Sequence, residues 1–215
     1  MRNLLRCFGM SVLVLASGFQ VAFPQNQAPG NYQALLTRLK QGDRTVDFVE
    51  IRRAYAESPE CNAGSDVLER KAMFNALDRR DFAQVLEHSR KILEKHYLNI
   101  DAHQAASVAN RELHIQAAAD FHHFVAQGLI GAIFHSGHCM SRETACEVLS
   151  VHEMETVFQV LGLNWDSASD SRVDSGTHSY EVLDVVNPNT KKKITLYFNN
   201  DWLDVCMKRS TNILD

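Results

Sequence analysis

The sequence lacks any long run of basic residues, and this absence argues against nucleic acid as a partner. Its 22 lysines and arginines stand against 26 acidic residues, and the net charge is −4. Nucleic-acid-binding proteins neutralise phosphates with clustered lysine and arginine side chains. The one cluster here, Lys191–Lys193, follows Asn187-Pro188-Asn189-Thr190, which is typical of an exposed hairpin turn. We therefore predict no nucleic-acid partner.

Motifs that identify common enzyme classes are also missing. The sequence has no Gly-x-Ser-x-Gly elbow, no phosphate-binding glycine loop, no nucleotide fingerprint and no paired-carboxylate motif. Ser136 has histidines on either side, but its neighbour Gly137 favours a turn that joins two parts of the chain. His135, His138 and Cys139 share one loop at a spacing that matches no known zinc finger. We predict no catalytic residue, no metal site and no cofactor.

Only the N-terminus carries a long apolar run, and it resembles a secretory signal. Arg2 and Arg6 precede the apolar stretch Cys7–Phe19, which is shorter than the roughly 20 residues that span a bilayer. The polar, proline-containing segment 24–30 then ends it. We expect residues 1–24 to be a cleaved signal peptide and the mature chain to be exported to the periplasm or outside the cell. No membrane span is predicted in the mature chain.

Four cysteines remain after the predicted signal: Cys61, Cys139, Cys146 and Cys206. In an oxidising compartment they permit two disulfides, with three connectivities. The Cys139–Cys146 pair closes the shortest loop and is the disulfide we single out. The alternative is that Cys146 is a free thiol in the core of a strand.

The first part of the mature chain has helical periodicity. We expect a linker and a first helix at 25–46 and helical hairpins at 47–130. Between Asn75 and Gly128 one pair of helices is echoed by the next about 33 residues later, close to the tetratricopeptide length. Each unit of such a repeat buries its apolar face by stacking on its neighbour. We expect the last of these helices to begin near Gln116 and to be capped by Gly128.

From residue 131 to 201 the pattern changes to short strands. Ser179–Val186 and Lys193–Asn199 flank an Asn-Pro-Asn turn and read as an antiparallel pair. We also expect a helix from His152 to Leu161, a strand near Leu163–Asp166 and a polar loop after it. Residues 202–215 are expected to form a docking tail. The prediction is an α+β fold, with tetratricopeptide-like hairpins packed against a small, mostly antiparallel sheet with one helix.

An ordered set of short elements covers roughly residues 47–201 and resembles an uncharacterised family of bacterial exported proteins. The set comprises Asp101-Ala102-His103, Phe121-His122, Gly128-Leu129, Ser136-Gly137, Thr144-Ala145, Ser150-Val151, Leu161-Gly162-Leu163, His178-Ser179-Tyr180 and Tyr197-Phe198-Asn199. The resemblance implies export and a similar fold, and it supplies no catalytic residue. This chain departs from the family after Gly137, where His138-Cys139-Met140 replaces a small acidic turn.

Stacked hairpins with a sheet at one end are expected to form a cleft at the junction of the two parts. The residues that we expect to contribute to binding there are His103, His122, Ser136, Gly137, His178, Tyr180, Tyr197 and Asn199. The competing interpretation is that the histidines cap helices and the tyrosines pack the sheet.

The function we predict is non-catalytic binding or assembly in the cell envelope, with a protein or peptide as partner. The alternative is an envelope hydrolase that uses the junction cleft, with Ser136 or a triad of Cys139, His178 and Asn199. The sequence gives no prediction of the oligomeric state.

Overall fold

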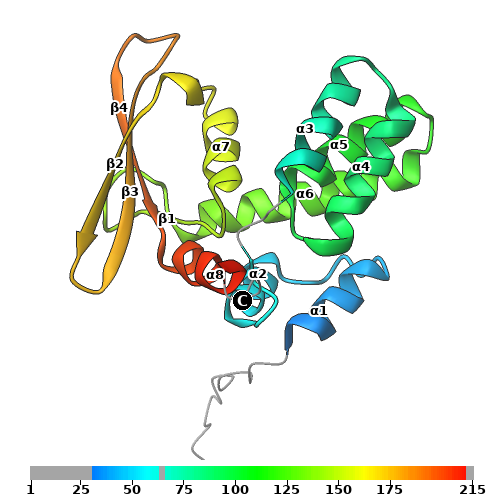
Figure 1. The fold of residues 1–215 in the computed structure, drawn as a ribbon, viewed down its shortest axis with the longest axis horizontal. Coiled ribbons are helices and arrows are strands. Elements are labelled where there is room, and N and C mark those ends of the chain that lie inside the picture. Colours follow the sequence, from blue (N-terminus) through cyan, green and yellow to red (C-terminus); the bar gives the residue numbers. More distant parts are fainter. Residues whose placement is uncertain (1–30, 63–65, 212–215) are drawn as a thin grey trace, which may run out of the picture.

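The computed structural model describes residues 31–62 and 66–211, which form an α+β fold as predicted (Figure 1). The predicted signal peptide, 1–24, and the linker up to residue 30 lie outside the described residues. The helices are α1 (Asn31–Lys40), α2 (Phe48–Glu57), α3 (Val67–Asp78), α4 (Phe82–Lys95), α5 (Ile100–Glu112), α6 (Gln116–Ser136), α7 (Val151–Val160), the 3-10 helix η1 (Trp165–Ser167) and α8 (Asp201–Thr211). The strands are β1 (Cys146–Glu147), β2 (Ser169–Ser175), β3 (His178–Val186) and β4 (Lys193–Asn199).

The predicted repeat is present as the hairpins α3/α4 and α5/α6. Each hairpin turns at a residue with positive φ, Arg80 at 57° and His114 at 60°, which lie 34 residues apart. The same closing bond follows each turn: Asp81 N–H donates to Ala76 O at 2.9 Å, and Ile115 N–H donates to Asn110 O at 2.8 Å. This is the Schellman ending, in which a left-handed residue stops one helix and the next begins. The period is therefore that of a tetratricopeptide unit.

Small residues allow the repeat helices to approach one another closely. Ala76 on α3 and three alanines of α5 are buried in one apolar cluster with Met73, Val85 and Ile92; the α5 alanines are Ala102, Ala105 and Ala109. Alanine also has the highest helix propensity, so these positions favour both the helix and its packing. The cluster is separate from the larger core that joins α1, α2, α6, α7, α8 and the sheet.

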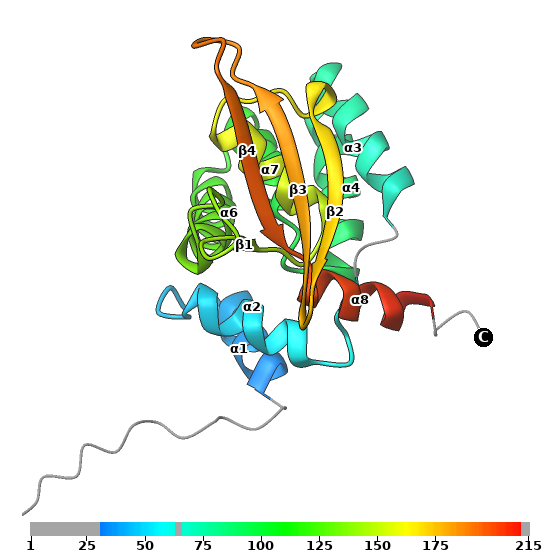
Figure 2. The same cartoon turned by 90° about the vertical axis from the view of Figure 1, so that its left-hand side faces the viewer.

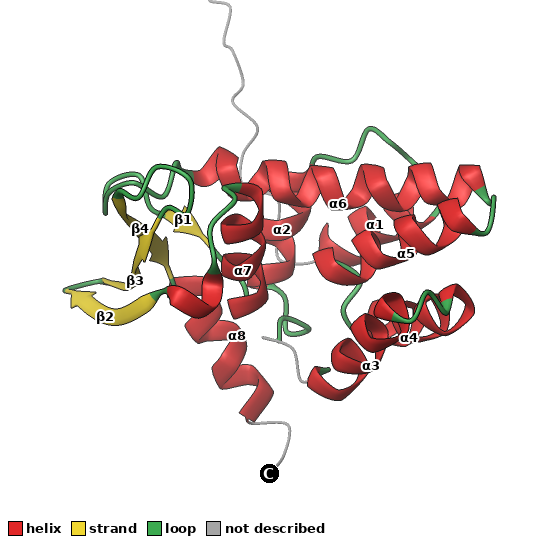
Figure 3. Cartoon of the chain, turned by 90° about the horizontal axis from the view of Figure 1, so that it is seen from above, coloured by secondary structure: helices red, strands yellow, loops and turns green. Residues whose placement is uncertain are grey.

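The prediction that Gly128 ends a helix was wrong. α6 is 21 residues long and runs from Gln116 to Ser136. It therefore passes the boundary at 130/131 that we expected between the helical and sheet parts. A Cβ at position 128 would overlap the ring of Phe48 on α2. Position 128 therefore has no room for a side chain, because α2 crosses α6 at this point. The long α6 extends from the repeat to the neighbourhood of α7 and the sheet (Figure 3).

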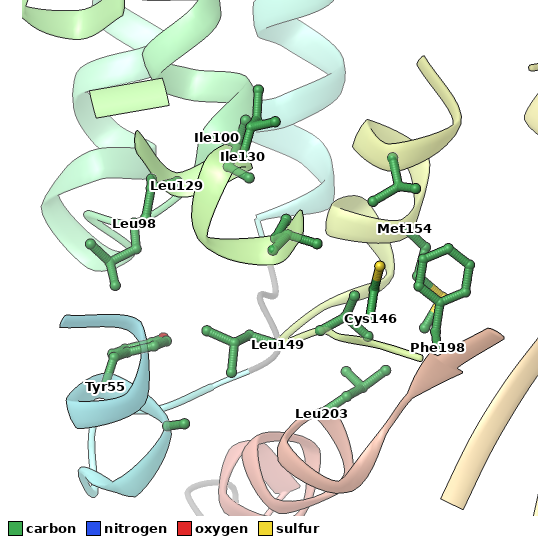
Figure 4. Packing of buried hydrophobic residues seen from close by; sticks show 14 of the residues in the cluster. Tyr55, Leu98, Ile100, Leu129, Ile130, Cys146, Leu149, Met154, Phe198 and Leu203 are labelled. Carbon is green, nitrogen blue, oxygen red and sulfur yellow. The ribbon is translucent and has the colours of Figure 1, made fainter. Parts of the chain in front are cut away.

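The sheet has the order β1-β4-β3-β2, and only the short β1 runs parallel to its neighbour. β3 pairs with β4 in an antiparallel register that places Leu183 opposite Leu196. These two side chains are buried on the face that packs into the core with α7 and α8. Figure 4 shows Phe198, Met154 and Leu203 meeting there, from β4, α7 and α8. The predicted small, mostly antiparallel sheet is confirmed.

Three details of the C-terminal third differ from the sequence predictions. The strand expected near Leu163–Asp166 is the turn of 3-10 helix η1, whose start is capped by Asn164 Oδ1 accepting from Asp166 N–H at 3.1 Å. The polar loop expected after it is β2, an edge strand whose side chains are mostly exposed. The expected tail begins with α8, which buries Leu203 and Cys206.

Two disulfides connect the elements. Cys139 is joined to Cys146, which ties the loop after α6 to β1, and Cys61 is joined to Cys206, which ties the end of the α2 segment to α8. Arg209 of α8 also donates to the carbonyl of Ala56 at 2.9 Å. α8 is thereby fixed against α2 (Figure 2). Within the described ranges, no helix is both long enough and apolar enough to cross a lipid bilayer.

Candidate functional site

Two of the predicted binding residues, His103 and His122, lie against each other. Asn99 caps α5 by accepting from Ala102 N–H at 2.9 Å, and His103 follows on the buried face of the helix with an exposed fraction of 0%. Antiparallel packing of α5 on α6 places His103 Nδ1 2.9 Å from His122 Nδ1. The other nitrogen of His103, Nε2, lies 2.8 Å from the carbonyl oxygen of Tyr97.

These contacts assign the protons of both rings. A carbonyl oxygen only accepts, so His103 Nε2 carries the hydrogen that bonds to Tyr97 O. Burial, with a further contribution from His122, lowers the pKa of His103 to about 3, and the ring is neutral near pH 7. Its Nδ1 is then an acceptor, and His122 Nδ1 must donate to it. In a neutral His122 ring, Nε2 therefore holds the lone pair.

His122 forms part of the wall of a pocket of about 290 Å³. We call this the histidine pocket, and its lining residues are Lys40, Leu86, Ser89, Arg90, Leu93, Glu94, Tyr97, Ala106 and His122. They come from α1, α4, the segment before α5, α5 and α6. Burial lowers the pKa of His122, so its ring also stays neutral near pH 7. His122 Nε2 has no hydrogen-bond partner among residues 31–62 and 66–211. It is also not one of the fully buried polar atoms that lack a partner there, so it remains accessible.

Several other polar side chains of the histidine pocket are already engaged. Lys40 Nζ lies 4.8 Å above the centre of the Tyr97 ring, a cation–π distance. Arg90 is paired with Glu87 at 3.0 Å and with Glu94. Ser89 Oγ donates to the sulfur of Met73. The pocket thus combines aliphatic and aromatic walls, a rim that carries Lys40, Arg90 and Glu94, and the His122 ring, whose Nε2 bonds to no described residue.

The predicted junction between the helices and the sheet is held by ion pairs to α7. Arg52 of α2 donates to Glu153 Oε2 at 2.7 Å, with side chains that are only 7% and 9% exposed. Arg52 also donates to the carbonyl of Glu147 on β1 at 3.2 Å. Glu153 in turn accepts from Leu149 N–H at 2.8 Å, just before α7 begins. These bonds join α2, β1 and α7, so the polar atoms involved hold the three elements together.

The other side of α7 contains the only group in the described residues with the spacing of metal ligands, Asp101, His152 and Glu155. Arg70 of α3 lies among them and donates to Asp101 at 2.6 Å and to Glu155 at 2.5 Å. A guanidinium group that donates to both carboxylates offsets part of their negative charge and occupies one oxygen of each. The three residues therefore act as a bridge between the repeat and α7.

A cavity of about 370 Å³ lies at this junction, and of the predicted binding residues only Ser136 lines it. The Ser136 hydroxyl donates to Ile133 O at 2.6 Å and accepts from Glu147 N–H at 2.8 Å. Gly137 is extended, and a Cβ there would overlap the carbonyls of Thr144 and Ala145. Ser136 and Gly137 thus allow the chain after α6 to lie close against the segment before β1.

The remaining predicted residues lie on the far side of the sheet. Tyr180 is paired with Asn199, and Tyr197 with Val182, on the face opposite Leu183. His178 is hydrogen-bonded to Asp201 at 2.5 Å. α7 stands between this sheet and the helices that carry His103 and His122 (Figures 1 and 3). The eight residues therefore do not form one site; the structure joins the two helical histidines and separates the sheet residues from them.

The histidine pocket is not visible as a unit in the sequence. Lys40, Leu86 and Tyr97 are distant in sequence from His122, and each alone reads as an ordinary helix-surface residue. The packing of α1 against the repeat brings them together. Comparisons with protein-family models, with curated proteins and with solved structures found no match to this chain.

Proposed function

We propose that this chain is a non-catalytic binding protein of the bacterial cell envelope that takes a side chain of a protein or peptide into the histidine pocket. The observation that carries this proposal is the His122 ring, which lines a pocket with aliphatic and aromatic walls and whose Nε2 has no partner among the described residues. Apolar pockets with a few placed polar groups are the usual form of ligand sites. Stacked helical hairpins are also a frequent scaffold for binding other chains.

Export is supported by the basic and apolar N-terminal sequence together with the disulfides. The four cysteines after the predicted signal are all paired, in two bonds that span different elements. Stable disulfides form in the periplasm and outside the cell and are rare in the cytosol. We therefore place the binding activity in an oxidising compartment.

The hydrolase alternative is not favoured by any contact of its named residues. The Ser136 hydroxyl is committed to two backbone groups, and Cys139 is bonded to Cys146. A nucleophile must be free to attack and must lie within reach of a base. Neither of the two residues meets this requirement in the structure, so we retain binding as the proposal.

The test compares two tryptophan substitutions on α4. Leu86→Trp would fill the histidine pocket, because Leu86 lines it, whereas Ala83→Trp is a matched change at an exposed position of the same helix. A random-peptide display library would be selected against the oxidised mature chain. The dissociation constants of the selected peptides would then be measured by calorimetry for the wild type and both variants.

We expect Leu86→Trp to weaken binding by tenfold or more and Ala83→Trp to leave it unchanged. Equal affinities for all three chains would show that the peptides bind elsewhere and would contradict the proposed site. A library that yields no specific peptide would contradict peptide binding itself. Thermal unfolding of each variant serves as the control for folding.

A further inference from the structure

We propose that the histidine pocket selects an aromatic side chain that ends in a hydrogen-bond donor, as tyrosine and tryptophan do. This inference rests on the proposed function and specifies the chemistry of its ligand. It follows from the proton order Tyr97 O, His103, His122, which leaves His122 Nε2 able to accept but not to donate.

The size and walls of the pocket suit one aromatic ring. An apolar cavity of about 150 Å³ is large enough to hold benzene, and the histidine pocket has about 290 Å³ and is open at its rim. Leu86 and Leu93 provide aliphatic contacts and Tyr97 an aromatic one. Rings that meet an aromatic wall edge-on or offset gain stabilisation beyond their buried area.

The chemistry of His122 then decides between ligands of similar shape. A phenylalanine ring would cover Nε2 without offering a hydrogen, and a covered polar atom without a partner weakens binding by roughly five- to a hundredfold. A carboxylate would place a second acceptor against the lone pair. A lysine would bring its charge to a rim on which two cations, Lys40 and Arg90, stand against one anion, Glu94. A phenol O–H or an indole N–H satisfies the acceptor and leaves the ring in the apolar part of the pocket.

Three small probes separate these cases: p-cresol, its methyl ether 4-methylanisole, and 3-methylindole. The first two share a ring and an oxygen, but only p-cresol can donate a hydrogen bond. Binding to the oxidised mature chain would be followed by two-dimensional NMR, with the ¹⁵N shifts of the histidine rings reporting on His122 Nε2. His122→Phe removes the acceptor, and His123→Phe is a matched change at the exposed neighbouring position on α6.

We expect p-cresol to bind at least about tenfold more tightly than 4-methylanisole and to shift the Nε2 resonance of His122. This preference should persist in His123→Phe and disappear in His122→Phe. The comparison of the two probes on the wild type is decisive even if His122→Phe fails to fold. The indole probe distinguishes a tyrosine from a tryptophan ligand, because it binds well only if the pocket admits a tryptophan side chain.

Three outcomes would overturn the inference in distinguishable ways. Equal affinities for p-cresol and 4-methylanisole would remove the donor requirement while leaving the proposed pocket in place. If none of the probes binds and none shifts a pocket resonance, the pocket is not an aromatic site and this inference fails, whereas the proposed function is decided separately by the peptide selection and the Leu86→Trp variant. A ¹⁵N shift of His122 Nε2 typical of a protonated nitrogen at pH 7 would also refute the proton order.

Discussion

Replacing Gly128 and Gly131 separately by alanine tests how α2 packs on α6. Both glycines lie inside the long helix α6. A Cβ at Gly131 would meet no described atom within 4 Å, whereas a Cβ at Gly128 would overlap the ring of Phe48. The two substitutions are chemically identical and lie three residues apart, so they differ chiefly in what the new methyl group contacts.

The structure gives opposite expectations for the two sites. Alanine is more favourable than glycine in a helix interior by about 0.8–1.0 kcal/mol, so Gly131→Ala should stabilise the protein by about that amount. Gly128→Ala gains the same propensity but adds an overpacking cost of about 1–3 kcal/mol. The net effect at Gly128 is therefore between neutral and about 2 kcal/mol destabilising. The double variant Gly128→Ala with Phe48→Leu should recover much of the overpacking cost.

The assay is urea and thermal unfolding of the oxidised mature chain, since about 1 kcal/mol shifts the melting temperature of a protein of this size by roughly 2–4 °C. We expect Gly131→Ala to melt above the wild type and Gly128→Ala clearly below Gly131→Ala. If the two variants are equally stabilised, the contact of Phe48 with Gly128 is not what excludes a side chain there.

Three further results are expected. Burial lowers the pKa of His103 to about 3 in the folded state, against 6.5 when unfolded, so the unfolded chain takes up the proton first. Urea unfolding should show that the contribution of His103 to stability falls below pH 6.5, by about 2 kcal/mol at pH 5, and that His103→Gln removes this share while the share of His122 remains. Arg52→Leu should lower the free energy of unfolding by about 3–5 kcal/mol, because it leaves the buried Glu153 carboxylate without its partner, and adding Glu153→Leu should recover a large part of this loss. In a double-mutant cycle, losses that simply add would refute the pairing. Replacing Cys61 and Cys206 by alanine should cost about 5 kcal/mol by loop-closure entropy, and a change below 1 kcal/mol in the melting analysis would contradict this.

Much of the helical part follows from local sequence signals. The starts of α4 and α6 and the near-34-residue period can be read from capping residues and apolar spacing, because these depend on neighbours in the chain. Gly128 was misread because glycine ends helices and also permits close contacts, and only the position of Phe48 distinguishes the two. β2 was missed because an exposed edge strand needs no apolar alternation.

The candidate site was less accessible to sequence analysis than the fold. His103 and His122 could be named, since both fall within the predicted helical hairpins, but their contact depends on the packing of α5 on α6. The proton order depends on a backbone carbonyl, that of Tyr97, which no side-chain pattern reveals. Tyr180 and Tyr197 lie on another face of the molecule because strand parity and the position of α7 are set by the whole sheet.

The Cys61–Cys206 bond has a mechanical consequence for the chain. The two cysteines are 145 residues apart in sequence, so a pull applied to the two ends of the chain passes across this bond and bypasses the polypeptide between them. About 500 Å of contour length is thereby withheld from extension. Under tension the polypeptide between the two cysteines, which contains the repeat hairpins and the sheet, would be shielded from extension. α1, which contributes Lys40 to the histidine pocket, and α2 lie outside this loop and would bear the load.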